Sequence, residues 1–221
     1  MKENALAGIS PQVHDLVEMD ANSLGCTDAP DWVRQSLTRC PWAVVRRARA
    51  PKGMISIGVR GSVRSERWGG WVETKVIRRI VEPSELLLVS RSRMEVTLTP
   101  ALQALEKVME QWQGLRLPWG PTGGVGFELA SGHPVTTPIS DLDIAIRASV
   151  RMSVECARLL WEQVKDLRPK VDVRVETPEC GFSLEEFVRP VPARILLQYP
   201  ECVALGDDPW CDRLPTLGAL E

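Results

Sequence analysis

The spacing of hydrophobic residues changes before the middle of the chain. In the first part, short apolar runs rich in branched residues, such as 42–46 and 54–60, are separated by prolines and glycines, among them Gly69-Gly70 and Pro83. Branched side chains suit the pleated, half-buried surface of a strand, whereas proline and glycine interrupt strands. We therefore expect a small β-rich N-terminal domain over residues 1–95.

Residues 96–221 follow a different pattern. Thr99-Pro100 is a typical helix start, and apolar residues then recur at helical spacing until Gly114. Further strands are predicted at 115–119, 139–147, 171–177 and 194–197, and further helices at 127–131, 153–167 and 184–188. Because strands and helices alternate, we expect a mixed sheet with flanking helices, and an α+β fold class for the whole chain.

The composition is that of a globular protein. Of 221 residues, 44% are hydrophobic and 25% are charged, which argues against disordered, collagen-like and coiled-coil chains. The apolar runs are far shorter than the roughly 18 residues that span a bilayer, and the N-terminal stretch lacks the apolar core of a secretory signal. Six scattered cysteines without a CxxC pair favour free thiols. We expect a cytoplasmic protein that does not contact a membrane.

Charge is distributed unevenly along the chain. Residues 34–79 contain twelve Lys and Arg but only Glu66 and Glu73 as acids, a net +10 (12 − 2) in a chain whose total is −2. Such segregation is typical of proteins that bind polyanions, and it is equally consistent with a solvated strand face that pairs with acids elsewhere. No basic-aromatic motif repeats, so no nucleic acid is expected. If Arg46 and Arg47 alternate along a strand, at most one points into any given cleft.

Three carboxylates are the strongest candidates for chemistry. Asp141 and Asp143 are two residues apart on a predicted strand, which places both on one face about 7 Å apart. Asp172 lies on a later predicted strand and approaches them if the two strands pair. Convergent carboxylates suit Mg²⁺, and a pair of such ions stabilises in-line displacement at phosphorus. The alternative is an ordinary acidic strand edge.

A glycine-rich turn at 120–126 precedes the carboxylates. Free backbone N–H groups at Thr122, Gly123 and Gly124 could bind phosphates. No Gly-Lys-Ser/Thr follows, so the turn is not a Walker motif, and the acidic residue typical of dinucleotide-binding folds is missing. On its own the turn is equally typical of a surface loop. Its combination with an Asp-x-Asp strand and a third Asp strand is more specific.

These residues resemble the signature of the DNA polymerase beta-like nucleotidyltransferases. That superfamily has a Gly-Gly or Gly-Ser turn, here Gly123-Gly124, then Asp-x-Asp, here Asp141-Leu142-Asp143, and a later carboxylate, here Asp172. More narrowly, the segments WGPTGGVGFELASG, SDLDIAIR and VDVRVETPECGFSLEEF are similar to malonate decarboxylase holo-acyl-carrier-protein synthases, also called phosphoribosyl-dephospho-CoA transferases. The resemblance implies a nucleotidyltransferase-like sheet in the second domain.

The same resemblance implies a reaction. A serine of the apo acyl-carrier subunit of malonate decarboxylase attacks 2′-(5″-triphosphoribosyl)-3′-dephospho-CoA, and pyrophosphate leaves. The alternatives are a nucleotidyltransferase that uses ATP or CTP on another protein or small molecule, and a non-catalytic module that binds a carrier or RNA.

The resemblance also assigns roles to residues. Mg²⁺ is expected at Asp141, Asp143 and Asp172, and Asp172 either completes a second ion's ligands or accepts the serine proton. The β- and γ-phosphates are expected at Thr122, Gly123 and Gly124. The donor's phosphates, or an acidic carrier surface, are expected to face Arg60, Arg64 and Arg67. His14 and His133 are alternative general bases, although each also fits a polar loop or core position.

Overall fold

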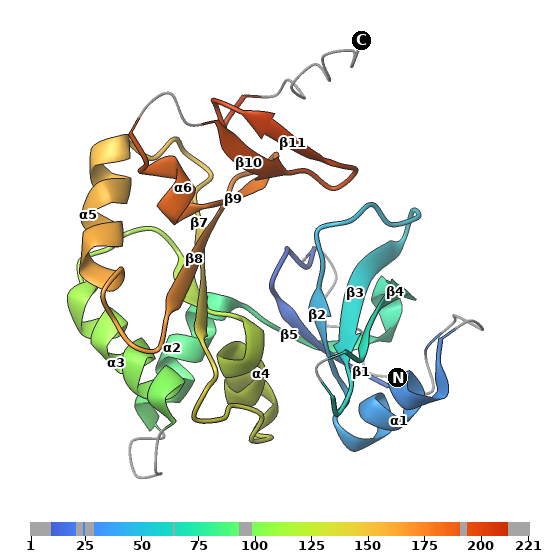
Figure 1. Ribbon diagram of the computed structural model, residues 1–221. Coiled ribbons are helices and arrows are strands. Elements are labelled where there is room, and N and C mark those ends of the chain that lie inside the picture. The colour runs from blue at the N-terminus through green and yellow to red at the C-terminus, as the bar shows by residue number, and fades with distance from the viewer. Residues whose placement is uncertain are drawn as a thin grey trace.

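The protein contains two β-sheets that face each other, each packed against helices (Figure 1). The computed structural model describes residues 10–20, 24, 29–63, 65–92, 99–190 and 194–211. The expected boundary at 95/96 and the candidate Arg64 lie outside these residues. An α+β fold with a mixed, nucleotidyltransferase-like sheet is confirmed.

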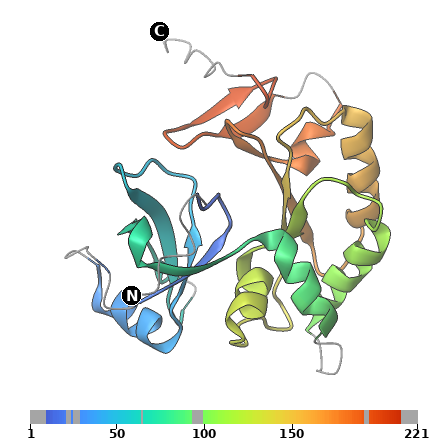
Figure 2. The same cartoon turned by 180° about the vertical axis from the view of Figure 1, so that it is seen from behind.

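The first sheet is antiparallel and has the strand order β4-β3-β2-β1-β5. Its strands are β1 (Leu16–Met19), β2 (Trp42–Val45), β3 (Met54–Arg60), β4 (Arg67–Glu73) and β5 (Ile77–Val81), with a 3₁₀ turn, η2 (Thr74–Val76), before β5. Helix α1 (Asp31–Arg39) covers one face, where Val33 and Leu37 are fully buried against Ile57. The opposite face of this sheet is turned toward the second sheet (Figure 2).

The second sheet has the order β11-β10-β9-β8-β7-β6, and among these strands β7 and β8 form the parallel pair. Its strands are β6 (Trp119–Pro121), β7 (Leu142–Arg147), β8 (Val171–Glu176), β9 (Gly181–Ser183), β10 (Ile195–Gln198) and β11 (Val203–Gly206). The helices around it are α2 (Pro83–Ser92), α3 (Pro100–Gln111), α4 (Gly123–Ser131), α5 (Val154–Val164) and α6 (Leu184–Phe187). Helices α3 and α5 lie on the side away from the first sheet (Figures 1 and 2).

Buried apolar and less buried polar side chains alternate along β7 and β8, so one face of these strands belongs to the core and the other faces the cleft between the two sheets. Leu142, Ile144 and Ile146 are fully buried in the helix-covered core, whereas Asp143 and Arg147 lie on the opposite face. The same division holds in β8, because successive side chains of a strand point to opposite faces. The charged residues of both strands therefore face the first sheet.

Several elements agree with the sequence pattern. The expected strands at β2 and β3, the helix that starts after Thr99 and the helix capped by Ser153 are confirmed. The Ser153 hydroxyl accepts a hydrogen bond from the Cys156 amide at 3.1 Å, which stabilises the first turn of α5.

Other expectations are wrong. Strand β4 runs through Gly69-Gly70 without the expected break. The N-terminal part is β-rich as expected, although it also contains helices α1 and α2. Helix α4 begins at Gly123, four residues earlier than expected, because β6 is confined to Trp119–Pro121 and the glycines form the first turn of the helix. The strand at 194–197 is not the last, since β11 pairs with it.

None of the helices in the described ranges combines the length and the apolar character needed to cross a bilayer.

Candidate active site

The candidate carboxylates lie on the cleft face of the parallel pair β7–β8. Asp143 is the register partner of Asp172, so their side chains leave adjacent strands side by side. Asp141 is exposed and lies just before the start of β7, which begins at Leu142 rather than at 139 as expected. Residues 137–140 form a turn instead, in which the Ser140 hydroxyl accepts a hydrogen bond from the Thr137 amide at 2.9 Å.

The start of helix α4 encloses Asp143. The Thr122 amide donates a hydrogen bond to the Asp143 carbonyl at 2.8 Å. Gly123 follows with φ of +55°, a left-handed conformation that favours glycine, and a Cβ there would collide with the Asp143 carboxylate. The sequence predicted a phosphate-binding glycine turn that leads into a short helix. The structure places that turn at a helix N-terminus, in direct contact with a carboxylate.

Burial and neighbouring acids make ionisation of Asp143 unfavourable. Burial raises the pKa of Asp143, and the negative charges of Asp172 and Asp141 raise it further, while His14 and Arg60 act in the opposite direction. All four groups therefore lie close enough to Asp143 for their charges to affect it. A cation bound beside Asp143 would relieve this cost.

Asp172 has a cationic partner of its own. Its Oδ1 lies 2.6 Å from the Lys170 ammonium, and its side chain is 46% exposed. Among the residues that the structure describes, no three His, Cys, Asp or Glu side chains form a ready metal cage. The donor set still fits Mg²⁺, because that ion usually takes one or two protein carboxylates and completes its shell with water and substrate phosphates.

An ion-pair network at the other end of β7 and β8 joins the two halves of the protein. The buried Glu176 carboxylate accepts a hydrogen bond from His14 Nε2 at 2.8 Å and pairs with Arg47. Burial alone would raise the pKa of Glu176, but His14 and Arg47 together hold it below its usual value. Arg147, the register partner of Glu176, lies 2.5 Å from Asp15.

Sequence reasoning missed this network, since His14 and Glu176 are 162 positions apart. The sequence indicated His14 as a general base or as a residue of a polar loop or core position. The one signal in the sequence was Glu176 near the end of a largely apolar predicted strand, because a carboxylate buried there needs hydrogen-bond or ion-pair partners. His133, the other histidine, is exposed and its hydrogen bonds stay within its own loop.

Glu128 is a second functional candidate that the sequence did not indicate. This buried residue of α4 accepts hydrogen bonds from the amides of Val135 and Thr136 and from the Thr136 hydroxyl, at 2.8–2.9 Å. It thereby fixes the loop that leads from α4 to Asp141.

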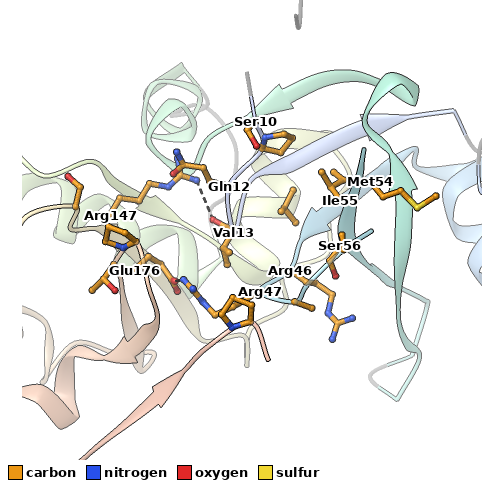
Figure 3. Close-up of a pocket in the computed structure, with 18 residues that line it drawn as sticks. Ser10, Gln12, Val13, Arg46, Arg47, Met54, Ile55, Ser56, Arg147 and Glu176 are labelled. Carbon is orange, nitrogen blue, oxygen red and sulfur yellow. Dashed lines mark hydrogen bonds and ion pairs between the residues drawn. The ribbon is translucent and has the colours of Figure 1, made fainter. Parts of the chain in front are cut away.

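A cavity of about 620 Å³ lies between the two sheets, next to the ion-pair network. Both Arg46 and Arg47 line it, and their side chains extend in different directions (Figure 3). Strand β2 ends at Val45, so strand alternation does not extend to these two residues. Figure 3 shows Arg47 extending toward Glu176 and Arg46 extending in another direction, away from Glu176.

Comparisons with known proteins cover both halves of the chain. The family model described as phosphoribosyl-dephospho-CoA transferase MdcG C-terminal domain matches residues 87–209, and the corresponding N-terminal domain matches residues 12–83. The chain belongs to this family.

Curated relatives with the name phosphoribosyl-dephospho-CoA transferase agree along nearly their whole length. The protein of Pseudomonas aeruginosa is 36% identical over 90% of this chain and 94% of its own. The proteins of Azotobacter vinelandii and Klebsiella pneumoniae strain 342 are 36% and 35% identical, over 94% and 97% of their own lengths. No solved structure matches the chain.

In this member of the transferase family, the candidate arginines within the described residues lie on the first sheet. Arg60 and Arg67 are register partners at one end of β3 and β4, and both are exposed. Arg60 is near enough to Asp143 to lower the pKa of that carboxyl, so this end of the first sheet faces the carboxylates.

Proposed function

We propose that this protein attaches the prosthetic group of malonate decarboxylase to its acyl-carrier subunit. A serine hydroxyl of the apo-carrier attacks the α-phosphorus of 2′-(5″-triphosphoribosyl)-3′-dephospho-CoA. The bond from the α-phosphorus to the oxygen that bridges it to the β-phosphate breaks, a phosphodiester to the serine forms, and pyrophosphate leaves with the bonding electron pair. The observation that carries the proposal is membership of the transferase family across both halves of the chain.

Asp141, Asp143 and Asp172 are the proposed Mg²⁺ ligands. When bound, Mg²⁺ would offset the charge of the triphosphate and of the departing pyrophosphate. The proposal is supported by the side-by-side register of Asp143 and Asp172, and by the raised pKa of Asp143, whose burial and acidic neighbours call for a compensating cation.

The remaining groups position the donor. The first amides of α4, at Gly123 and Gly124, would donate hydrogen bonds to the β- and γ-phosphates, with Thr122 in the preceding position, and Gly123 contacts Asp143 directly. Arg60 adds positive charge from the opposite sheet. Asp172, held by Lys170, is available to accept the serine proton or to complete the metal's ligands. Because phosphoryl transfer depends mostly on positioning and charge neutralisation, no nucleophile from this chain is required.

The proposal is tested by the choice of donor. Purified apo-carrier is incubated with the protein, Mg²⁺ and either the triphosphoribosyl donor, ATP or CTP, and the intact mass of the carrier is measured. We expect a mass increase at the carrier serine with the triphosphoribosyl donor alone. Transfer from ATP or CTP, with none from the triphosphoribosyl donor, would contradict the proposal in favour of a nucleotidyltransferase. Metal-independent carrier binding without any transfer would contradict it in favour of a binding module.

A further inference from the structure

The open face of the first sheet carries three arginines in a row. Helix α1 covers the other face, so side chains that alternate with Ile57 point into the cleft. In β3 and β4 these are the register pairs Ser56–Trp71, Gly58–Gly69 and Arg60–Arg67. Arg46, just after β2, lies on the same face, where its backbone amide donates to the Ser56 carbonyl.

Arg46 lies flat across the glycine pair. A Cβ at Gly69 would collide with the Arg46 guanidinium, and a Cβ at Gly58 would lie 3.0 Å from the Arg46 Cδ. The two glycines thus leave a shallow channel that the arginine side chain fills. This explains why glycine is tolerated in the interior of two paired strands, where it normally weakens the sheet.

These arginines have no ion-pair partner among the described residues. Within the described part of the chain, no ion pair joins Arg46, Arg60 or Arg67 to an acidic side chain, whereas Arg47 and Arg78 each have a carboxylate partner. An arginine that is fixed in place and has no acidic partner is suited to forked contacts with phosphate oxygens.

The row connects two places in the cleft. Arg60 is near Asp143, toward the start of β7, whereas Arg46 lines the cavity next to Arg147, at the end of β7. Asp143 and Arg147 are four positions apart along β7, which corresponds to about 13 Å. The cavity volume of about 620 Å³ is in the range of small-molecule sites, and part of its wall is apolar, from Val45, Met54 and Ile55.

We infer that Arg46, laid across Gly58 and Gly69, binds the diphosphate of the dephospho-CoA half of the donor and places that half in the cavity. The inference rests on the proposed function, in which the donor's triphosphate lies at Asp143. The donor has a second group of phosphates, the diphosphate that links its adenosine to its pantetheine arm, and two linked riboses separate the two groups. Arg46 lines a cavity of small-molecule size, which favours a small molecule over a carrier protein as its ligand.

Three variants test the assignment. Arg46→Ala removes the charge, Arg46→Lys keeps the charge but removes the fork, and Gly69→Ala keeps the arginine but displaces it. Arg39→Ala is the matched control, because it removes an exposed arginine from α1, on the covered side of the same sheet. Binding of dephospho-CoA and of inorganic tripolyphosphate, each with Mg²⁺, is measured by calorimetry.

We expect Arg46→Ala and Gly69→Ala to weaken dephospho-CoA binding about tenfold or more, since a charged hydrogen bond contributes about 1.5–3 kcal/mol. Arg46→Lys should cause a smaller loss. Tripolyphosphate binding should stay within about twofold of wild type in all variants, and Arg39→Ala should bind both ligands normally. If Gly69→Ala does not fold, the two Arg46 variants still decide the outcome.

Unchanged dephospho-CoA affinity in Arg46→Ala would overturn the inference. So would a variant that binds dephospho-CoA normally but has lost affinity for the apo-carrier, because Arg46 would then serve the protein partner. These outcomes are distinct from failure of the proposed function, which is a wild-type protein that transfers nothing from the triphosphoribosyl donor to the carrier.

Discussion

Asp143 shows a conflict between stability and function at the level of a single residue. The folded protein holds this carboxyl in a partly buried site beside two other acids, which raises its pKa. A group whose pKa is raised on folding stabilises the protein while it is protonated, and that contribution is lost as the pH rises through the folded pKa. At neutral pH the ionised Asp143 therefore reduces stability, and a bound cation would restore it.

Replacing Asp143 with Asn should consequently stabilise the metal-free protein at neutral pH and abolish transfer. The gain in the free energy of unfolding should disappear as the pH approaches the usual carboxyl value of 3.8, and the transfer rate should fall about 100-fold or more. Urea denaturation over a pH series measures the first effect and carrier modification the second.

Asp208→Asn is the control of opposite sign. The hydrogen bond from Arg151 lowers the pKa of Asp208, so its removal should destabilise the protein at neutral pH. An Asp143→Asn variant that is less stable than wild type at neutral pH would contradict the interpretation of Asp143.

At the level of elements, the site depends on how helix α4 begins. Gly123 combines a left-handed φ with close contact to Asp143. Gly53 has φ of +81°, but a Cβ there would meet no atom within 4 Å. A substitution at Gly53 therefore introduces backbone strain alone, whereas one at Gly123 introduces both strain and a collision with Asp143.

Gly123→Ala should therefore lower both stability and activity, whereas Gly53→Ala should lower stability alone, by about 1–2 kcal/mol. Chemical denaturation and the carrier transfer assay, applied to both variants, measure the two effects. Full activity in Gly123→Ala would show that the start of α4 does not constrain Asp143.

The sequence predicts such elements where a local pattern determines them. Helices α3 and α5 have helical spacing and recognisable N-termini, and β7 and β8 alternate clearly. The uninterrupted β4 could not be predicted, because its Gly69 accommodates a side chain from a distant part of the chain, Arg46, which follows β2. The register that sets Asp143 beside Asp172 is likewise a long-range property of two strands separated by a helix.

At the scale of the whole molecule, the two sheets are joined by buried charges. Glu176 at the end of β8 binds His14 and Arg47, both from the N-terminal half, and its pKa is lowered as a result. A carboxyl whose pKa is lowered on folding stabilises the protein above its usual pKa, and this contribution is lost as the pH falls through the folded value.

Glu176→Gln should destabilise the protein by about 3 kcal/mol at neutral pH, because it leaves the largely buried Arg47 guanidinium without its carboxylate. The difference from wild type should shrink below the usual glutamate value of 4.5. Thermal and urea unfolding of both proteins measure it. The control is Glu201→Gln, whose partner Arg49 is 80% exposed, and which should change stability by at most about 0.5 kcal/mol. Equal effects of the two substitutions would contradict a structural role for the network.

In the proposed reaction, the three carboxylates act in transfer through a bound metal ion. The decisive measurement is the rate at which apo-carrier gains the prosthetic group from the triphosphoribosyl donor, followed by intact mass as Mg²⁺ is titrated. Wild-type protein should require Mg²⁺ and lose activity in excess chelator, and the Asp141→Asn, Asp143→Asn double variant should be slower by about 100-fold or more at every Mg²⁺ concentration. Transfer at the wild-type rate in chelator, or by the double variant, would contradict the account.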